Sequence, residues 1–174
     1  NNWDVSKVKT MKNMFRGAIS FNQPLNKWNV GEVMDMEEMF EAAYKFNQNI
    51  NSWNVSKVKN MSYMFNSAKE FNQPLNNWNV SSVEDMTCMF RYTKKFNQPL
   101  NSWDVSKVKY MEEMFYEAES FNQNLNRWNV SKVKNMARMF CDAKKFNQDL
   151  SMWKVQGATD TVNMFLGSPL ENRK

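Results

Sequence analysis

"FNQPLNNWNVSSVEDMTCMF", residues 71–90, is one copy of a pattern that repeats along the whole chain. Its tryptophan recurs every 25 residues without an insertion, at Trp3, Trp28, Trp53, Trp78, Trp103, Trp128 and Trp153. Self-similarity at a fixed period of about 20–50 residues is typical of solenoids and other stacked repeats. The sequence therefore predicts a stack of similar units in which each unit covers the apolar side of the next.

The first half of each unit reads as a short strand. Leu75, Trp78, Val80 and Val83 follow the spacing L-x-x-W-x-V-x-x-V, and the Trp and Val two residues apart share one side of an extended chain. This spacing matches the L-x-x-L-x-L skeleton of leucine-rich repeats, with Trp and Val at leucine positions. We expect the tryptophans to pack in the core, with Trp3 as the exposed exception.

The second half of each unit reads as a helix. Val58, Met61, Phe65 and Ala68 recur at the spacing of one helical face. Ser56 stands where a helix N-cap would be, and serines recur at equivalent positions in other units. The helical spacing assigns the methionines to the core.

These halves predict an α/β repeat solenoid that resembles a leucine-rich repeat, with one short parallel strand and one helix per unit. Strands stack about 4.8 Å apart and packed helices about 8–10 Å apart, so the strands would line a concave side. We expect a single domain over residues 1–174 with about seven repeats. The first repeat begins in mid-motif, and about residues 156–174 form a degenerate C-terminal cap.

Composition argues against an enzyme. The chain has no histidine, which removes the commonest catalytic acid, base and metal ligand, and it shows no cofactor or metal motif. Its net charge is +5, and the charge changes sign repeatedly between successive tryptophans, which argues against a continuous nucleic-acid groove. No apolar run is long enough for a membrane span. The two cysteines, Cys88 and Cys141, are expected to be free thiols.

The motifs F-N-Q-P-L-N-x-W-N-V and M-x-x-M-F resemble the BspA-like repeats of bacterial surface proteins, a variant of the leucine-rich repeat with 25–26 residues. The resemblance covers roughly residues 1–168. It implies a cell-surface or secreted protein associated with adhesion, with no catalytic residues. Anchoring through a part of the protein before residue 1 stays open.

The outward positions of the predicted strand are the candidate binding site. These residues lie one position before or after each tryptophan, on the predicted concave face: Lys27, Asn29, Asn54, Asn77, Asn79, Asp104, Arg127 and Asn129. A simple solvated face is the alternative. The repeated Asn and Gln of F-N-Q are expected to form hydrogen-bonded ladders between units, with a ligand-binding amide array as the alternative.

The leading functional hypothesis is a monomeric, non-enzymatic interaction module that binds a protein or glycan through the concave strand face. A structural spacer with no ligand of its own is the second hypothesis. Reading of nucleic acid by successive repeats is the third, and the interrupted charge argues against it.

Overall fold

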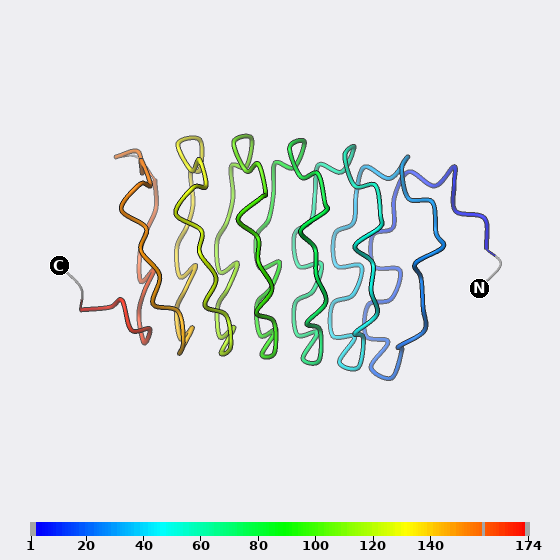
Figure 1. The fold of residues 1–174 in the computed structure, drawn as a ribbon, viewed down its shortest axis with the longest axis horizontal. Coiled ribbons are helices and arrows are strands. Elements are labelled where there is room, and N and C mark those ends of the chain that lie inside the picture. Colours follow the sequence, from blue (N-terminus) through cyan, green and yellow to red (C-terminus); the bar gives the residue numbers. More distant parts are fainter. Residues whose placement is uncertain (1–2, 158, 173–174) are drawn as a thin grey trace.

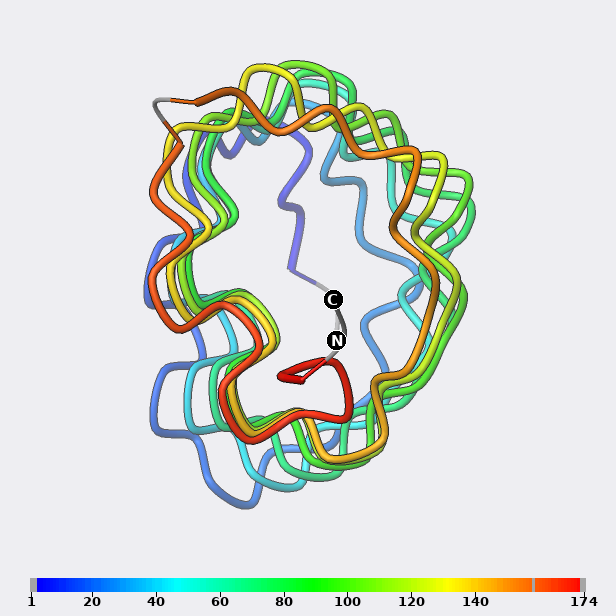
Figure 2. The ribbon, with the colours of Figure 1, turned by 90° about the vertical axis from the view of Figure 1, so that its left-hand side faces the viewer.

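The chain winds into a stack of coils, with one coil for every 25 residues (Figure 1). The computed structural model describes residues 3–157 and 159–172. Single parallel bridges join equivalent residues of successive coils: Thr10 to Asp35, Asp35 to Asn60, Asn60 to Asp85, Asp85 to Tyr110, Tyr110 to Asn135, and Asn135 to Asp160. Seen down the stack, the coils superimpose closely in outline (Figure 2).

The described residues contain no helix and no strand longer than these single bridges. The prediction of an α/β solenoid with a leucine-rich-repeat unit is therefore wrong, and so is the division into a concave strand side and a convex helix side. Ser56 caps no helix. The same finding means that no described segment forms a helix that could cross a membrane.

The spacing of the coils explains why helices cannot form. The ring centroids of Phe40 and Phe65, and of Phe65 and Phe90, are 5.7 and 5.6 Å apart. Packed helices need about 8–10 Å between their axes. Successive coils are therefore too close for a helix in each, and the apolar residues reach the core from a tightly turning backbone instead.

Backbone hydrogen bonds show how this backbone replaces a helix. The N–H groups of Met61, Tyr63, Phe65 and Ser67 donate to carbonyls of the next coil at 2.7–3.0 Å. In between, the N–H groups of Met64 and Asn66 donate three residues back, at 3.2 and 3.0 Å, and the Ser62 N–H donates to the Asn60 Oδ1 at 2.9 Å. Tyr63 and Ser67 have positive φ angles of 57° and 60°, which an α-helix does not allow.

The core follows the predicted apolar positions. The four central tryptophans are 2–3% exposed, the phenylalanines from Phe40 to Phe146 are fully buried, and Trp3 is 68% exposed, all as predicted. Trp78 and Trp103 stack at 6.4 Å with 2° between their planes. The Trp78 Nε1–H donates to the Ile50 carbonyl at 3.0 Å, which satisfies the one polar atom of the buried indole.

Amide ladders join the coils at the F-N-Q motif, as predicted. The Asn47 Oδ1 accepts from the Asn72 backbone N–H at 2.9 Å and from the Gln73 Nε2 at 3.1 Å. The next coil repeats these bonds, since Asn72 Oδ1 accepts from Asn97 and Gln98. These amides therefore stabilise the stack by satisfying backbone donors at the turn.

At the C-terminal end the chain adds part of a further coil and then turns across the end of the stack (Figure 2). Leu170 is buried there, while Trp153, Val155 and Phe165 line an open hollow of about 490 Å³. The predicted cap over about residues 156–174 includes Ala158 and residues 173–174, which lie outside the described residues.

Candidate functional site

All eight predicted site residues are exposed. They form two columns that flank the buried tryptophans, because each coil places equivalent residues above those of the coil before it. Lys27, Asn77 and Arg127 belong to the column before the tryptophan. The column after it contains Asn29, Asn54, Asn79, Asp104 and Asn129.

The column after the tryptophan has a structural task that sequence reasoning did not assign. Each side-chain oxygen accepts a hydrogen bond from the backbone N–H two residues later, as from Ser56 to Asn54 at 3.2 Å and from Ser106 to Asp104 at 3.0 Å. The same bond runs from Gly31 to Asn29, from Ser81 to Asn79 and from Ser131 to Asn129. The Ser106 bonds lower the pKa of Asp104. This column therefore fixes a turn in every coil.

The column before the tryptophan borders hollows in the surface. A hollow of about 550 Å³ is lined by seven residues, most of them with amide side chains: Pro24, Asn26, Gln48, Asn49, Asn51, Ser52 and Asn77. A second, of about 380 Å³, is lined by Asn101, Asn124, Asn126, Arg127 and Met152. We call these two hollows together the amide groove. Of the eight predicted residues, Asn77 and Arg127 line it.

Sequence reasoning missed the asparagine two positions before each tryptophan from Trp28 to Trp128. Asn51 donates from Nδ2 to Asn76 Oδ1 at 3.3 Å, and its own Oδ1 accepts from the Asn77 backbone N–H at 3.0 Å. Asn126 Oδ1 accepts from the Met152 backbone N–H at 2.9 Å. The signal was the N in L-N-x-W, which recurs from Asn26 to Asn126.

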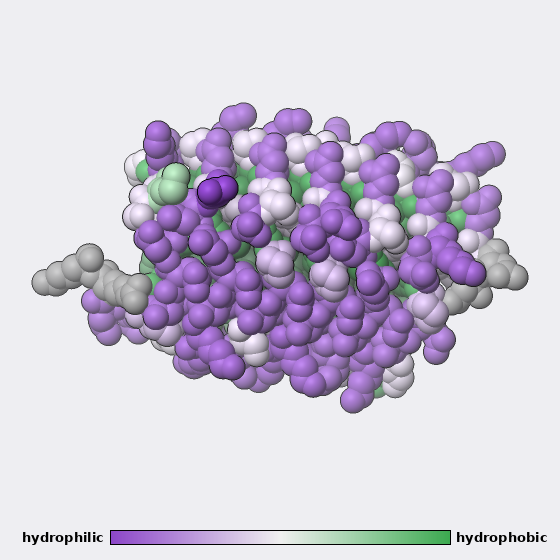
Figure 3. Space-filling view, viewed as in Figure 1, coloured by the Kyte–Doolittle hydropathy of each residue, from purple (hydrophilic) through white to green (hydrophobic). Residues whose placement is uncertain are grey.

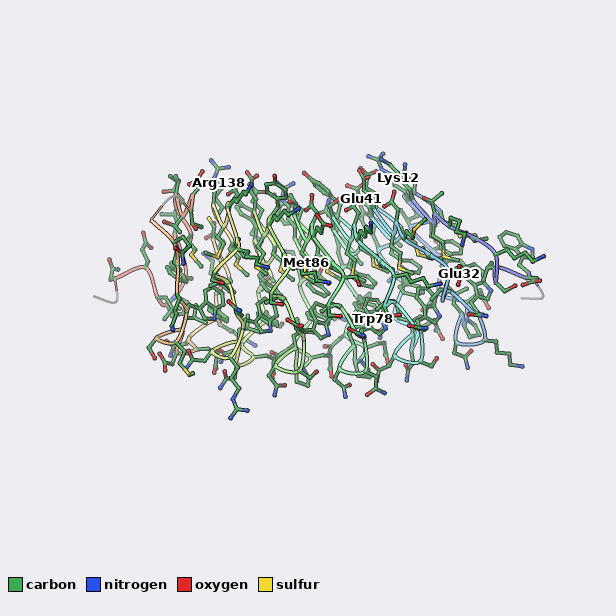
Figure 4. The ribbon with its side chains drawn as sticks, turned by 90° about the horizontal axis from the view of Figure 1, so that it is seen from above. Lys12, Glu32, Glu41, Trp78, Met86 and Arg138 are labelled. Carbon is green, nitrogen blue, oxygen red and sulfur yellow. The ribbon has the colours of Figure 1, made fainter. Side chains whose placement is uncertain are left out.

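Ion pairs between coils cover another side of the stack. Lys12 pairs with Glu37 at 2.7 Å and Arg16 with Glu41 at 2.7 Å, and Arg91 and Arg138 both pair with Glu113. Figure 4 places Lys12, Glu41 and Arg138 along this side of the stack. The acidic side chains of the second coil thus find partners in the adjoining coils.

The described residues show no cluster of three metal-ligating side chains. Cys88 and Cys141 are free thiols, as predicted, and both are buried. Burial raises the pKa of the Cys88 thiol to about 12, which keeps it protonated at neutral pH. What the described surface offers a partner is therefore a wide polar face (Figure 3) with the amide groove as its hollow part.

Comparison with known proteins gives one family. A family model described as "Mycoplasma protein of unknown function, DUF285" matches the chain twice, over residues 1–95 and over residues 74–174. Two overlapping matches of one family model are what a repeat protein produces, while the resemblance to BspA-like repeats stays unconfirmed. No curated protein and no solved structure matches the chain.

Proposed function

The chain belongs to the DUF285 family of Mycoplasma repeat proteins, and from this premise we propose that it is a non-enzymatic interaction module. Its partner is a protein or a glycan, which binds along the amide groove and the exposed column that borders it. The finer resemblance to BspA-like surface repeats supports a place at the cell surface or outside the cell, and a role in adhesion.

The observation that carries this proposal is the amide groove itself. Side-chain amides present both donors and acceptors, and backbone N–H groups hold several of those that line the groove at fixed positions, as Asn51 N–H holds Asn49 Oδ1 at 2.9 Å and Asn77 N–H holds Asn51 Oδ1 at 3.0 Å. A partner with regularly spaced hydroxyl or peptide groups would meet prearranged polar atoms in successive coils. Stacked repeats commonly present such extended surfaces to their partners.

The structural spacer is the second candidate. It is favoured by the column after the tryptophan, whose side-chain oxygens are engaged in turns of the chain itself. A protein that serves as a spacer needs these turns and needs no ligand.

A glycan and peptide array distinguishes the two functions. We expect binding that is lost, by tenfold or more, in the variant Lys27→Ala/Asn77→Ala/Arg127→Ala. The matched control Lys45→Ala/Asn147→Ala/Arg138→Ala removes the same charges and one amide from other exposed positions and should bind as the parent does. Absence of any ligand, or equal loss in both variants, would favour the spacer.

A further inference from the structure

A second surface carries a regular row of lysines. In three of the coils a lysine lies on each side of a buried valine, in the sequence Lys-Val-Lys: Lys57 and Lys59, Lys107 and Lys109, Lys132 and Lys134. Five of these lysines are exposed and Lys109 is half-buried, so each pair faces solvent. We call these six residues the lysine stripe.

Contacts to two glutamates show that these positions lie side by side in adjoining coils. Glu32 occupies the first lysine position of its coil and pairs with both Lys9 and Lys57, from the coils before and after it. Glu84 occupies the second position and pairs with Lys109 at 2.5 Å. Lys109 lowers the pKa of Glu84, with smaller contributions from Lys59 and Lys107. The stripe therefore runs along the stack, from coil to coil.

The charge of the whole molecule is concentrated here. Counted over all coils, the two positions hold eight lysines and two glutamates, for a net charge of +6. The chain as a whole carries +5, so all its other residues together carry −1. Charge summed over successive segments of the sequence does not reveal this concentration, because acidic residues of other faces lie between these lysines in the sequence.

The protein neutralises the stripe only in part, because Glu32 pairs with Lys57 and Glu84 with Lys109 while the other four lysines are left without an ion pair among the described residues. The ion-pair side with Lys12, Glu41 and Arg138 lies away from Glu32 in Figure 4. Among the described residues, Lys132 and Lys134 form no ion pair, and Lys107 faces Glu84 and Asp104 without a direct one. Like charges on adjoining coils repel each other, and an anionic ligand would relieve that repulsion.

We propose that the lysine stripe binds a linear anionic polysaccharide along the stack, at a site separate from the amide groove. The stripe is two residues wide and spans four coils, roughly 15 Å at about 4.8 Å per coil, so it fits a chain of charges better than a flat membrane. Clustered lysines attract sulfated polysaccharides and nucleic acids alike. The stripe contains no arginine for bidentate phosphate contacts. The exposed ring of Tyr110 lies beside Lys109, but the equivalent residues of the adjoining coils, Asp85 and Asn135, offer no ring on which successive bases could stack, which favours the polysaccharide.

Heparin, a sulfated linear polysaccharide, is the probe. We expect the protein to bind heparin at 150 mM NaCl and the variant Lys107→Gln/Lys132→Gln/Lys134→Gln to bind at least tenfold more weakly. Loss of three contacts should also lower the slope of log K against log salt by roughly two to three. The control Lys45→Gln/Lys69→Gln/Lys145→Gln removes the same charge elsewhere and should change affinity less than twofold.

Four results would overturn the proposal: no heparin binding by the parent, equal loss in both variants, tighter binding to single-stranded RNA than to heparin, or binding to anionic phospholipid vesicles without binding to heparin. All six lysines are at least partly exposed, so unchanged thermal stability of both variants will show that a loss of binding comes from charge. The variant at Lys27, Asn77 and Arg127 keeps the stripe. Heparin binding by that variant separates this site from the amide groove.

Discussion

Single side-chain amides accept hydrogen bonds from backbone N–H groups of the next coil. Asn72 shows this well, because its Oδ1 receives both the Asn97 backbone N–H at 2.9 Å and the Gln98 Nε2 at 3.1 Å. A partly buried donor that loses its acceptor costs about 1–3 kcal/mol. The constant letters of F-N-Q are therefore explained by stacking, and no ligand is needed to account for them.

Asn72→Ala should accordingly lower the free energy of unfolding by about 1–3 kcal/mol, because two donors lose their acceptor. Urea denaturation measures it. Asn77→Ala is the matched control, since that side chain is exposed and its Oδ1 accepts a weak contact from Asn76 at 3.4 Å. The control should change stability by no more than about 0.5 kcal/mol. Equal effects at both sites would refute a structural role for the ladder.

Glu32 gives a prediction for pH at the same scale. Hydrogen bonds from Lys57 and Lys9 lower its pKa from 4.5 to about 2. Because the folded pKa lies below the unfolded one, its contribution to stability is present above about pH 4.5 and is lost as the pH falls through about 2. An NMR titration of the Glu32 carboxyl should report the low value.

Lys57→Gln should raise the Glu32 pKa toward 4.5. Lys12→Gln is its control, because Lys12 pairs with Glu37 instead, and it should leave the Glu32 titration unchanged. A Glu32 pKa near 4.5 in the parent protein would contradict the paired arrangement.

At the scale of elements, the turning segment that replaces the helix depends on residues with positive φ. The second such position in each coil holds Gly17, Ala42, Ser67, Tyr92, Glu117, Asp142 and Gly167 in successive coils. The left-handed region costs a non-glycine residue roughly 1–2 kcal/mol, while glycine adopts it freely. At this second position, five of the seven coils therefore carry strain that the interactions between coils outweigh.

Ala42→Gly should raise the free energy of unfolding by about 0.5–1 kcal/mol, because relief of the φ of 54° exceeds the entropic cost of glycine. Ala43→Gly, one residue further along, is the control. Ala43 is fully buried and has no positive φ, so the same chemical change there should destabilise by about 1 kcal/mol. Thermal and urea unfolding of the two variants will show whether each change raises or lowers the free energy of unfolding. A loss of stability in both variants would contradict a strained turn at Ala42.

The same segment shows what the sequence could predict. Burial of Val58, Met61, Phe65 and Ala68 followed from their spacing and is correct. The helix was wrong because spacing at three and four residues also fits a chain that turns every three residues, and a pattern within one repeat carries no information on the distance between coils. At the site, exposure of Asn77 and Arg127 was predictable. The amide groove was not predictable. Its asparagines recur from repeat to repeat as regularly as the core residues do, so the sequence pattern does not distinguish a surface residue from a core residue there.

At the scale of the molecule, each coil contacts the coil before and the coil after it, so stability should depend on position along the stack. Phe90 is fully buried and stacks on Phe65 and Phe115 at 5.6 Å on either side. Phe15, at the equivalent position of the first coil, is partly buried and stacks on Phe40 at 5.5 Å in the coil that follows. The central coils should therefore be more stable against unfolding than the coils at the two ends of the stack.

Phe90→Ala should cost about 3–5 kcal/mol of unfolding free energy, and Phe15→Ala about half as much, because fewer contacts are lost. Denaturant unfolding measures both. Hydrogen exchange should in addition show the amide protons of the central coils exchanging most slowly. Equal losses in the two variants would contradict a stack held together by contacts between neighbours.

The hydrogen bonds between central coils join residues that are 24 to 28 positions apart, with equivalent partners from coil to coil. Loss of one residue would misalign the contacts between its coil and the adjoining coils, whereas loss or gain of 25 residues would restore the same contacts one coil further along. A gene for this fold can therefore change the length of its product in whole repeats, and every product of that kind would still stack.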